Sequence, residues 1–139
     1  MIVLTRTLSV KAAGRRLYDV TSEVSGIVKE SKVSAGLCCV FVRHTSASIV
    51  IQENADPAVL RDLERWLAKL APEDKVAYEH DAEGPDDMPA HLRSAVTRTS
   101  ESVPVVGGAL FLGTWQAIYL WEHRRGAHLR DVVVTVLGQ

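Results

Sequence analysis

The pattern of apolar and polar positions predicts several β-strands. Residues 2–9 alternate between apolar and polar side chains, which is typical of a strand with one buried face. Leu37–Arg43 is apolar at nearly every position and predicts a central strand, followed by a second strand at Ile49–Gln52. Asp131–Leu137 is rich in valine and predicts a closing strand. Further strands are expected at residues 17–20, 102–106, 109–112 and 117–121.

One helix has a clear beginning and a clear apolar face. Asp56 suits the N-cap and Pro57 the first helical position, because the proline lacks an N–H that would have no partner there. Helical spacing then puts one set of residues on a single face, and it predicts that Trp66 lies in the core. These residues are Val59, Leu60, Leu63, Trp66, Leu67 and Leu70. Two shorter helices are expected to begin at Thr21 or Ser22 and at Pro89.

Together these elements predict one α+β domain over residues 1–139. Strands joined by hairpins give a mainly antiparallel sheet, and two to three helices flank it. The length fits a single domain. With 47% hydrophobic and 24% charged residues, the composition is typical of a globular protein.

Charge and hydropathy limit the kinds of partner that we expect for this chain. Sixteen basic and seventeen acidic residues give a net charge of −1, so we expect no nucleic acid partner. No apolar run approaches the ~20 residues of a membrane helix, and we expect no membrane partner. The first ten residues are too polar for a signal peptide, which makes the cytoplasm the expected location.

Candidate chemistry is densest in residues 78–91. This stretch holds His80, His91 and five acidic residues, broken by glycine and proline. On charge alone it reads as a solvated acidic loop. Two more histidines, His44 and His123, each follow an apolar strand, so four imidazoles could converge on a divalent ion. Three imidazoles with an open position suit catalytic zinc, and carboxylates nearby could orient the rings.

Two other chemistries stay open. Ser46 or Ser48 lies near His44 in sequence and could act as a nucleophile with a histidine base, although no nucleophile-elbow sequence is present. The hydroxyls of this segment could equally bond to their own backbone. The basic turn of residues 124–130 could hold a phosphate.

Five motifs occur in one order along the chain. They read His-Thr-Ser-Ala-Ser at 44–48, Glu-Asn-Ala-Asp-Pro at 53–57, Glu-Gly-Pro-Asp-Asp-Met-Pro-Ala-His at 83–91, Gly-Thr-Trp-Gln at 113–116 and Glu-His-Arg at 122–124. In this order they resemble the YjbQ-like family, whose members are often described as secondary thiamine-phosphate synthases. The resemblance runs from about Leu4 to Gly138.

The resemblance implies a β-sandwich-like core with flanking helices, assembled as a homotrimer with a metal-binding polar cleft. It implies an enzyme that joins a pyrimidine methyl diphosphate to a thiazole phosphate and releases pyrophosphate, so a small phosphorylated metabolite is the expected ligand. A protein that binds metal or metabolite without catalysis is the alternative. Histidine-rich ligation favours zinc over magnesium. The implied metal ligands are His44, His80, His91 and His123, the catalytic carboxylates Glu83, Asp86, Asp87 and Glu122, and the substrate-binding residues Thr45, Ser46, Ser48, Asn54 and Gln116.

Overall fold

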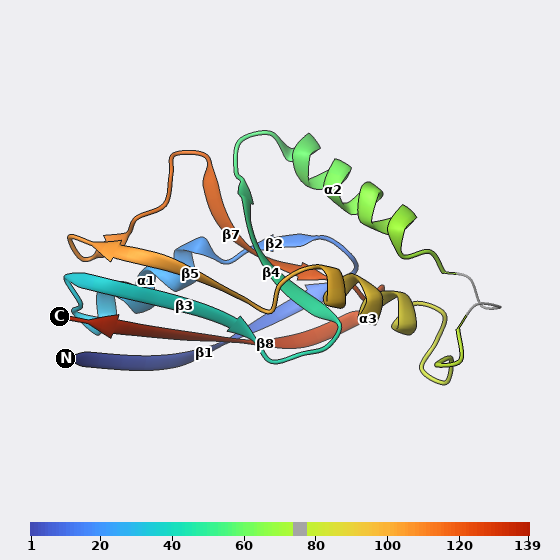
Figure 1. The fold of residues 1–139 in the computed structure, drawn as a ribbon, viewed down its shortest axis with the longest axis horizontal. Coiled ribbons are helices and arrows are strands. Elements are labelled where there is room, and N and C mark those ends of the chain that lie inside the picture. The colour runs from blue at the N-terminus through green and yellow to red at the C-terminus, as the bar shows by residue number, and fades with distance from the viewer. Residues whose placement is uncertain (74–77) are drawn as a thin grey trace.

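The computed structural model describes residues 1–73 and 78–139 (Figure 1). In this part of the chain three helices accompany two antiparallel sheets, which confirms the predicted α+β class. The strands are β1 (Ile2–Ala13), β2 (Leu17–Asp19), β3 (Ala35–Val42), β4 (Ala47–Glu53), β5 (Ser100–Val106), β6 (Ala109–Leu110), β7 (Gln116–Glu122) and β8 (Ala127–Gly138). The helices are α1 (Thr21–Ser31), α2 (Pro57–Leu70) and α3 (Asp87–Val96).

The larger sheet has five strands in the order β1-β8-β3-β5-β6. The two termini meet in it, because β1 and β8 pair along their whole length from Ile2↔Gly138 to Ala13↔Ala127. The strand predicted as central, β3, does lie between β8 and β5. Gly36 makes this close pairing possible, since a Cβ there would lie 2.0 Å from the Leu137 carbonyl oxygen.

The smaller sheet has three strands in the order β2-β7-β4. Its inner residues, such as Ile49 and Leu120, join the valines of β3 and β8 in one hydrophobic core. Helix α1 adds Val24 and Val28 to the same core. The two sheets and α1 therefore bury one shared apolar interior, as the sandwich-like prediction expected.

Helix α2 begins as predicted but is buried less than predicted. Asp56 caps it by accepting a hydrogen bond from the Ala58 N–H at 2.9 Å, and Pro57 follows. Leu67 is its one buried residue, however, and Trp66 remains 59% exposed. The prediction that Trp66 lies in the core is wrong for the single chain. Amphipathic spacing shows that an apolar face exists, but it does not show what covers that face.

Helix α3 begins at Asp87, two residues before the predicted start at Pro89. Pro89 is accommodated in the first turn because the first four N–H groups of a helix have no partner within it. The earlier start matters for the candidate site. It places Asp87 and His91 one turn apart on the same helix face.

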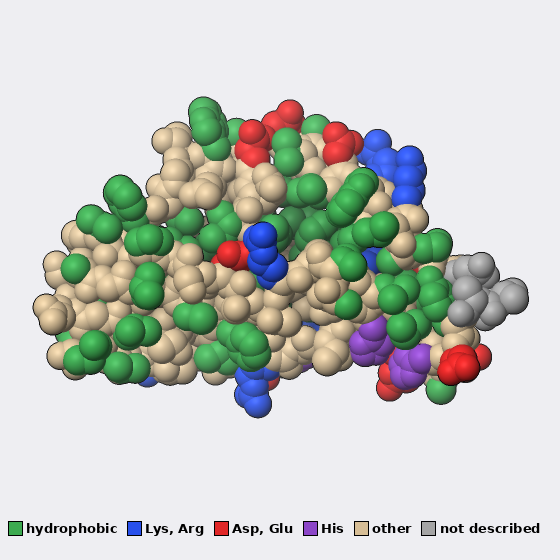
Figure 2. All heavy atoms as spheres, in the orientation of Figure 1, with side chains coloured by type: hydrophobic (Ala, Val, Ile, Leu, Met, Phe, Trp, Pro, Cys, Tyr) green, Lys and Arg blue, Asp and Glu red, His purple; other side chains and the backbone are tan. Residues whose placement is uncertain are grey.

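Part of the outer face of the five-stranded sheet is apolar and exposed. One row across it runs Val3, Leu137, Leu37 and Pro104 on neighbouring strands. Val3 is 65% and Leu37 46% exposed, and Phe41 and Val106 on the same sheet are exposed too. Figure 2 shows hydrophobic side chains gathered over these strands and over α2. Among the described residues, no helix is both long and apolar enough to span a bilayer.

Candidate metal centre

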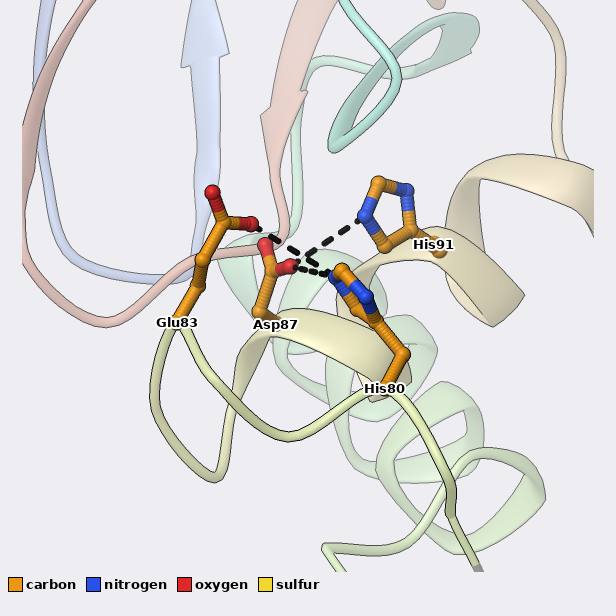
Figure 3. A group of neighbouring side chains, drawn as sticks. All are labelled: His80, Glu83, Asp87 and His91. Atoms are coloured by element: carbon orange, nitrogen blue, oxygen red, sulfur yellow. Dashed lines mark hydrogen bonds and ion pairs between the residues drawn. The ribbon is translucent and has the colours of Figure 1, made fainter.

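The loop before α3 and the first turn of α3 form one cluster of possible metal ligands. It consists of His80, Glu83, Asp87 and His91, whose nearest ligand atoms all lie within 4.8 Å of one another (Figure 3). His80 and Glu83 come from the loop, whereas Asp87 and His91 project from α3. Histidines and acidic side chains are seen together at this end of the molecule in Figure 2. We call these four residues the His-Asp cluster.

Asp87 is the centre of the His-Asp cluster. Its Oδ2 lies 2.7 Å from His80 Nε2 and 3.2 Å from His91 Nε2. Its Oδ1 forms an ion pair with Arg124 at 3.0 Å, so both oxygens are engaged. Burial alone would raise the pKa of Asp87, but the hydrogen bond with His80 and the charge of Arg124 lower it. The carboxylate is therefore charged and held in one orientation between the two rings.

His91 presents its Nε2 to this carboxylate because its other nitrogen is already used. The Nδ1–H donates to the Thr45 carbonyl at 3.1 Å. In a neutral imidazole of this tautomer, Nε2 carries a lone pair, and that lone pair faces Asp87 Oδ2. Two acceptors face each other favourably only if a proton or a cation lies between them. A backbone carbonyl that fixes the remote N–H is also the usual support of a metal-binding histidine.

Arg124 and Asp86 hold the loop in place behind the cluster. Arg124 Nε donates to Asp86 Oδ2 at 3.0 Å, and the Arg125 N–H donates to the same oxygen at 2.9 Å. Burial tends to raise the pKa of Asp86, yet these bonds lower it to about 2. Gly84 permits the turn, because its φ of 102° disfavours any side chain. Asp86 therefore lies next to the cluster as an anchor and is not part of it.

His44 lies outside the His-Asp cluster, although its neighbour Thr45 touches it. His44 Nε2 accepts a hydrogen bond from the Asp131 N–H at 2.8 Å. The ring is therefore bound to β8, and its proton sits on Nδ1. Burial and the charge of Arg130 lower the pKa of His44. In the neutral ring the lone pair of Nε2 accepts the Asp131 N–H, and Nδ1 carries the proton. Neither nitrogen is free to bind a metal ion in this arrangement.

His123 is also outside the cluster, fully buried at the end of β7. Its Nε2 lies 2.7 Å from the Ser48 hydroxyl, which also contacts the Thr97 hydroxyl. Since Thr97 donates its proton to the Arg93 carbonyl, Ser48 donates to Thr97 and His123 donates to Ser48. Among the described residues, Nδ1 of His123 has no hydrogen-bond partner. Ser48, proposed as a nucleophile from sequence, is itself fully buried.

We expect the His123 ring to stay neutral at pH values far below the usual pKa of histidine. Burial, followed by the charges of Arg93 and Arg130, lowers its pKa from 6.5 to about 3. Because the unfolded chain takes up this proton near pH 6.5, it holds more protons than the folded chain between pH 6.5 and 3. This group therefore lowers the free energy of unfolding as pH falls through that interval. Nitrogen-15 NMR should show an Nε2–H tautomer with no titration above pH 4; a ring that titrates near pH 6.5 would contradict this.

Glu122 pairs with Arg130 in the interior. Its oxygens accept from Arg130 Nε at 2.8 Å and from Nη2 at 2.5 Å, and they also accept the backbone N–H groups of His123 and Arg124. Arg130 donates in addition to the Ser46 hydroxyl at 2.9 Å. Glu122 has no exposed surface. Through these bonds Glu122 and Arg130 connect β7, β8 and the residue that precedes β4.

The structure separates the remaining predicted substrate-binding residues from the cluster. The β4–β7 ladder runs from Ala47↔Glu122 at one end to Glu53↔Gln116 at the other, a length of roughly 20 Å. Asn54 and Gln116 lie at this far end. Asn54 donates to the Thr114 carbonyl, and Gln116 accepts the Gly113 N–H. In one copy of the chain these two residues stabilise a turn.

Sequence reasoning overlooked Arg124 as a residue of the site. From sequence, Arg124 belongs with Arg130 to a basic turn that could hold a phosphate. In the structure both arginines form ion pairs with carboxylates. Arg124 pairs with Asp86 and Asp87. Arg130 pairs with Glu122. The Glu-His-Arg motif at 122–124 was the signal that could have pointed to Arg124.

The sequence and the fold of this chain are similar to those of known proteins. A family model described as UPF0047 protein YjbQ-like matches residues 6–139, and the chain belongs to this family. A UPF0047 protein of Synechocystis is 54% identical over 132 residues, covering 95% of this chain and 90% of that protein. The YjbQ protein of Salmonella typhimurium is 44% identical, covering 97% and 96%.

Solved structures show the same fold. A YjbQ-like protein of unknown function from Sulfolobus solfataricus superimposes with a TM-score of 0.90 at 28% identity, covering 99% of this chain and 98% of that one. A YjbQ/UPF0047 protein from Clostridium acetobutylicum gives a TM-score of 0.88 at 38% identity, covering 95% and 99%. These matches establish the family and the fold.

Proposed function

We propose that the His-Asp cluster binds one divalent metal ion and that the protein is a metal-assisted enzyme acting on a small phosphorylated metabolite. The observation that carries this proposal is the approach of His91 Nε2 to Asp87 Oδ2 at 3.2 Å while Nδ1 donates to Thr45. His80, His91 and Asp87 would hold the ion. Two imidazoles and a carboxylate match catalytic zinc sites and favour zinc over magnesium.

The chain's own residues give the cluster the support that metal chemistry needs. Arg124 fixes the Asp87 carboxylate, and the Thr45 carbonyl fixes the His91 ring. Glu83 lies 3.5 Å from His80 Nε2 and is largely exposed, so it is placed to accept a proton from a ligand or to bind the ion as a fourth group. A bound ion would polarise a phosphoryl oxygen or lower the pKa of a water molecule. We assign Asp86 and Glu122 structural rather than catalytic roles, because their oxygens are taken up by arginines and backbone N–H groups.

Thiamine phosphate formation is the specific reaction that we propose to test. A pyrimidine methyl diphosphate and a thiazole phosphate supplied with Zn²⁺ or Mg²⁺ should release pyrophosphate, measured by a coupled assay. The rate should fall at least about 100-fold in Asp87→Asn, because the charge that holds both imidazoles is lost. The same loss is not expected in Asp81→Asn, a loop carboxylate outside the cluster. Absence of pyrophosphate release from metal-loaded wild-type protein would contradict this reaction.

Metal or metabolite binding without catalysis is favoured by one feature of the cluster. The side chains of His80 and Glu83 are 47% and 65% exposed, whereas enzymes that handle reactive intermediates usually enclose them away from water. Zinc binding together with no turnover on phosphorylated substrates would support this alternative.

We also propose that the chain assembles as a homotrimer. The exposed apolar row on the five-stranded sheet and the exposed Trp66 and Leu70 of α2 support this, because exposed apolar surface often marks an interface between chains. Light scattering should give three times the chain mass of 15.2 kDa. Leu37→Glu, at the centre of the row, should shift the mass toward the monomer, whereas Lys29→Glu on α1 should not. A monomeric wild-type protein would contradict the proposal.

A further inference from the structure

A cavity lies between α2 and the segment that leads into β2, apart from the His-Asp cluster. Its volume is about 540 Å³, within the range of small-molecule sites. Four arginines line it, namely Arg15, Arg16, Arg61 and Arg65. The apolar residues Leu17, from β2, and Leu60 and Ala68, from α2, also line it. None of these residues belongs to the His-Asp cluster.

Among residues 1–73 and 78–139, the acidic residue of the lining is Glu64, and it does not neutralise these arginines. Glu64 accepts two hydrogen bonds from Arg93, at 2.7 and 2.8 Å, and a third from Trp121 Nε1 at 3.3 Å. Arg93 is fully buried and lies outside the lining, so the charge of Glu64 balances a cation elsewhere. The cavity therefore retains the positive charge of its own guanidinium groups.

The arginines differ in how far other groups already engage them. Arg15 pairs with Glu73, but Glu73 also pairs with Arg125. One carboxylate therefore balances the charge of only one of these two arginines. Arg65 lies 3.6 Å from Asp62 on an exposed surface, where such a pair is weak. Arg16 and Arg61 have no carboxylate within 4.0 Å among residues 1–73 and 78–139. An excess of positive charge thus surrounds an apolar wall.

Two of the arginines are also held in position before any ligand arrives. Arg15 Nε donates to the His123 carbonyl at 3.1 Å, and the Arg16 guanidinium lies over the Tyr18 ring at 4.6 Å from its centre. Groups fixed in this way lose little conformational entropy when they bind an anion. Planar guanidinium groups also recognise phosphate through paired N–H donors.

From the cavity volume, the uncompensated arginines and the apolar wall, we propose that this cavity is a binding site for an organic phosphate with a small apolar ring. The phosphate would contact Arg16 and Arg61, and the ring would lie against Leu60 and Ala68. This site is independent of metal binding by the His-Asp cluster, and the proposal does not rest on the function proposed above.

Phenylphosphonate is a suitable probe, because its C–P bond resists hydrolysis and binding is measured without turnover. Calorimetry should show binding that weakens at least about tenfold in Arg16→Ala and in Arg61→Ala. Two matched controls should bind as the wild type does: Arg43→Ala, an exposed arginine outside the cavity, and Asp87→Asn in the cluster. NMR shifts of the Leu60 and Ala68 methyl groups should follow the same titration.

Each other outcome would overturn the proposal. Equal weakening in the Arg16, Arg61 and Arg43 variants would show attraction by general charge only. Loss in Asp87→Asn alone would place the anion at the His-Asp cluster, and no binding at millimolar phenylphosphonate would remove the site. Equally tight binding of benzamide, a neutral ring compound, would show that the arginines do not recognise the phosphonate.

Discussion

Asp87→Asn should lower the affinity of the protein for Zn²⁺ at least about 100-fold. Loss of a group that merely supports a metal ligand already costs 10- to 100-fold. Asp87 does more, because one of its oxygens approaches both His80 and His91 while the other is held by Arg124. Asparagine keeps the shape but removes the charge that would balance the ion. Calorimetric titration with Zn²⁺ measures the change directly.

The matched control for this change is Asp81→Asn. Asp81 lies in the same loop and is exposed, but it does not belong to the His-Asp cluster. Its substitution removes the same charge from the neighbourhood and should alter Zn²⁺ affinity little. If Asp87→Asn bound Zn²⁺ as tightly as the wild type, the His-Asp cluster would not be the metal site.

Glu122→Gln should lower the free energy of unfolding by about 3–5 kcal/mol. The change leaves Arg130 charged in the interior without its partner, and a buried cation that loses its carboxylate is strongly destabilising. Urea denaturation measures the difference. Glu101→Gln, which breaks a surface pair with Arg98, should change stability by less than about 1 kcal/mol.

Replacing both partners provides a second test of this pair. Glu122→Gln combined with Arg130→Met removes both charges but keeps a side-chain oxygen for the backbone N–H groups of His123 and Arg124, so it should cost less than Glu122→Gln alone, because no unpaired ion is left. A folded Glu122→Gln variant with wild-type stability but no turnover would instead favour the catalytic role expected from the resemblance. The two results separate a structural carboxylate from a catalytic one.

The sequence predicted most of the fold because its strands and helix starts follow local rules. Alternation along residues 2–9 and the valine-rich run at 131–137 mark β1 and β8, which the structure pairs throughout. The Asp-Pro start of α2 is equally local. Trp66 could not be placed, because the periodicity of a helix does not identify the surface that covers its apolar side.

The candidate site was predicted in part. Asp87 and His91 are four residues apart, so their meeting on one helix face follows from spacing once α3 is known to begin at Asp87. The separation of His44 and His123 from the cluster could not be predicted. It depends on which group each ring meets in the fold, the Asp131 N–H for His44 and the Ser48 hydroxyl for His123. Those partners come from strands distant in sequence.

Metal content of untagged protein tests the central claim most directly. Wild type should carry one zinc ion per chain, and His80→Ala and His91→Ala should lose it, because their Nε2 atoms face Asp87. His44→Ala should retain the ion, since that ring is bound to the backbone of β8. The opposite pattern, with metal lost in His44→Ala and kept in the His80 and His91 variants, would contradict the account. A wild-type protein that neither carries nor takes up a divalent ion would contradict it as well.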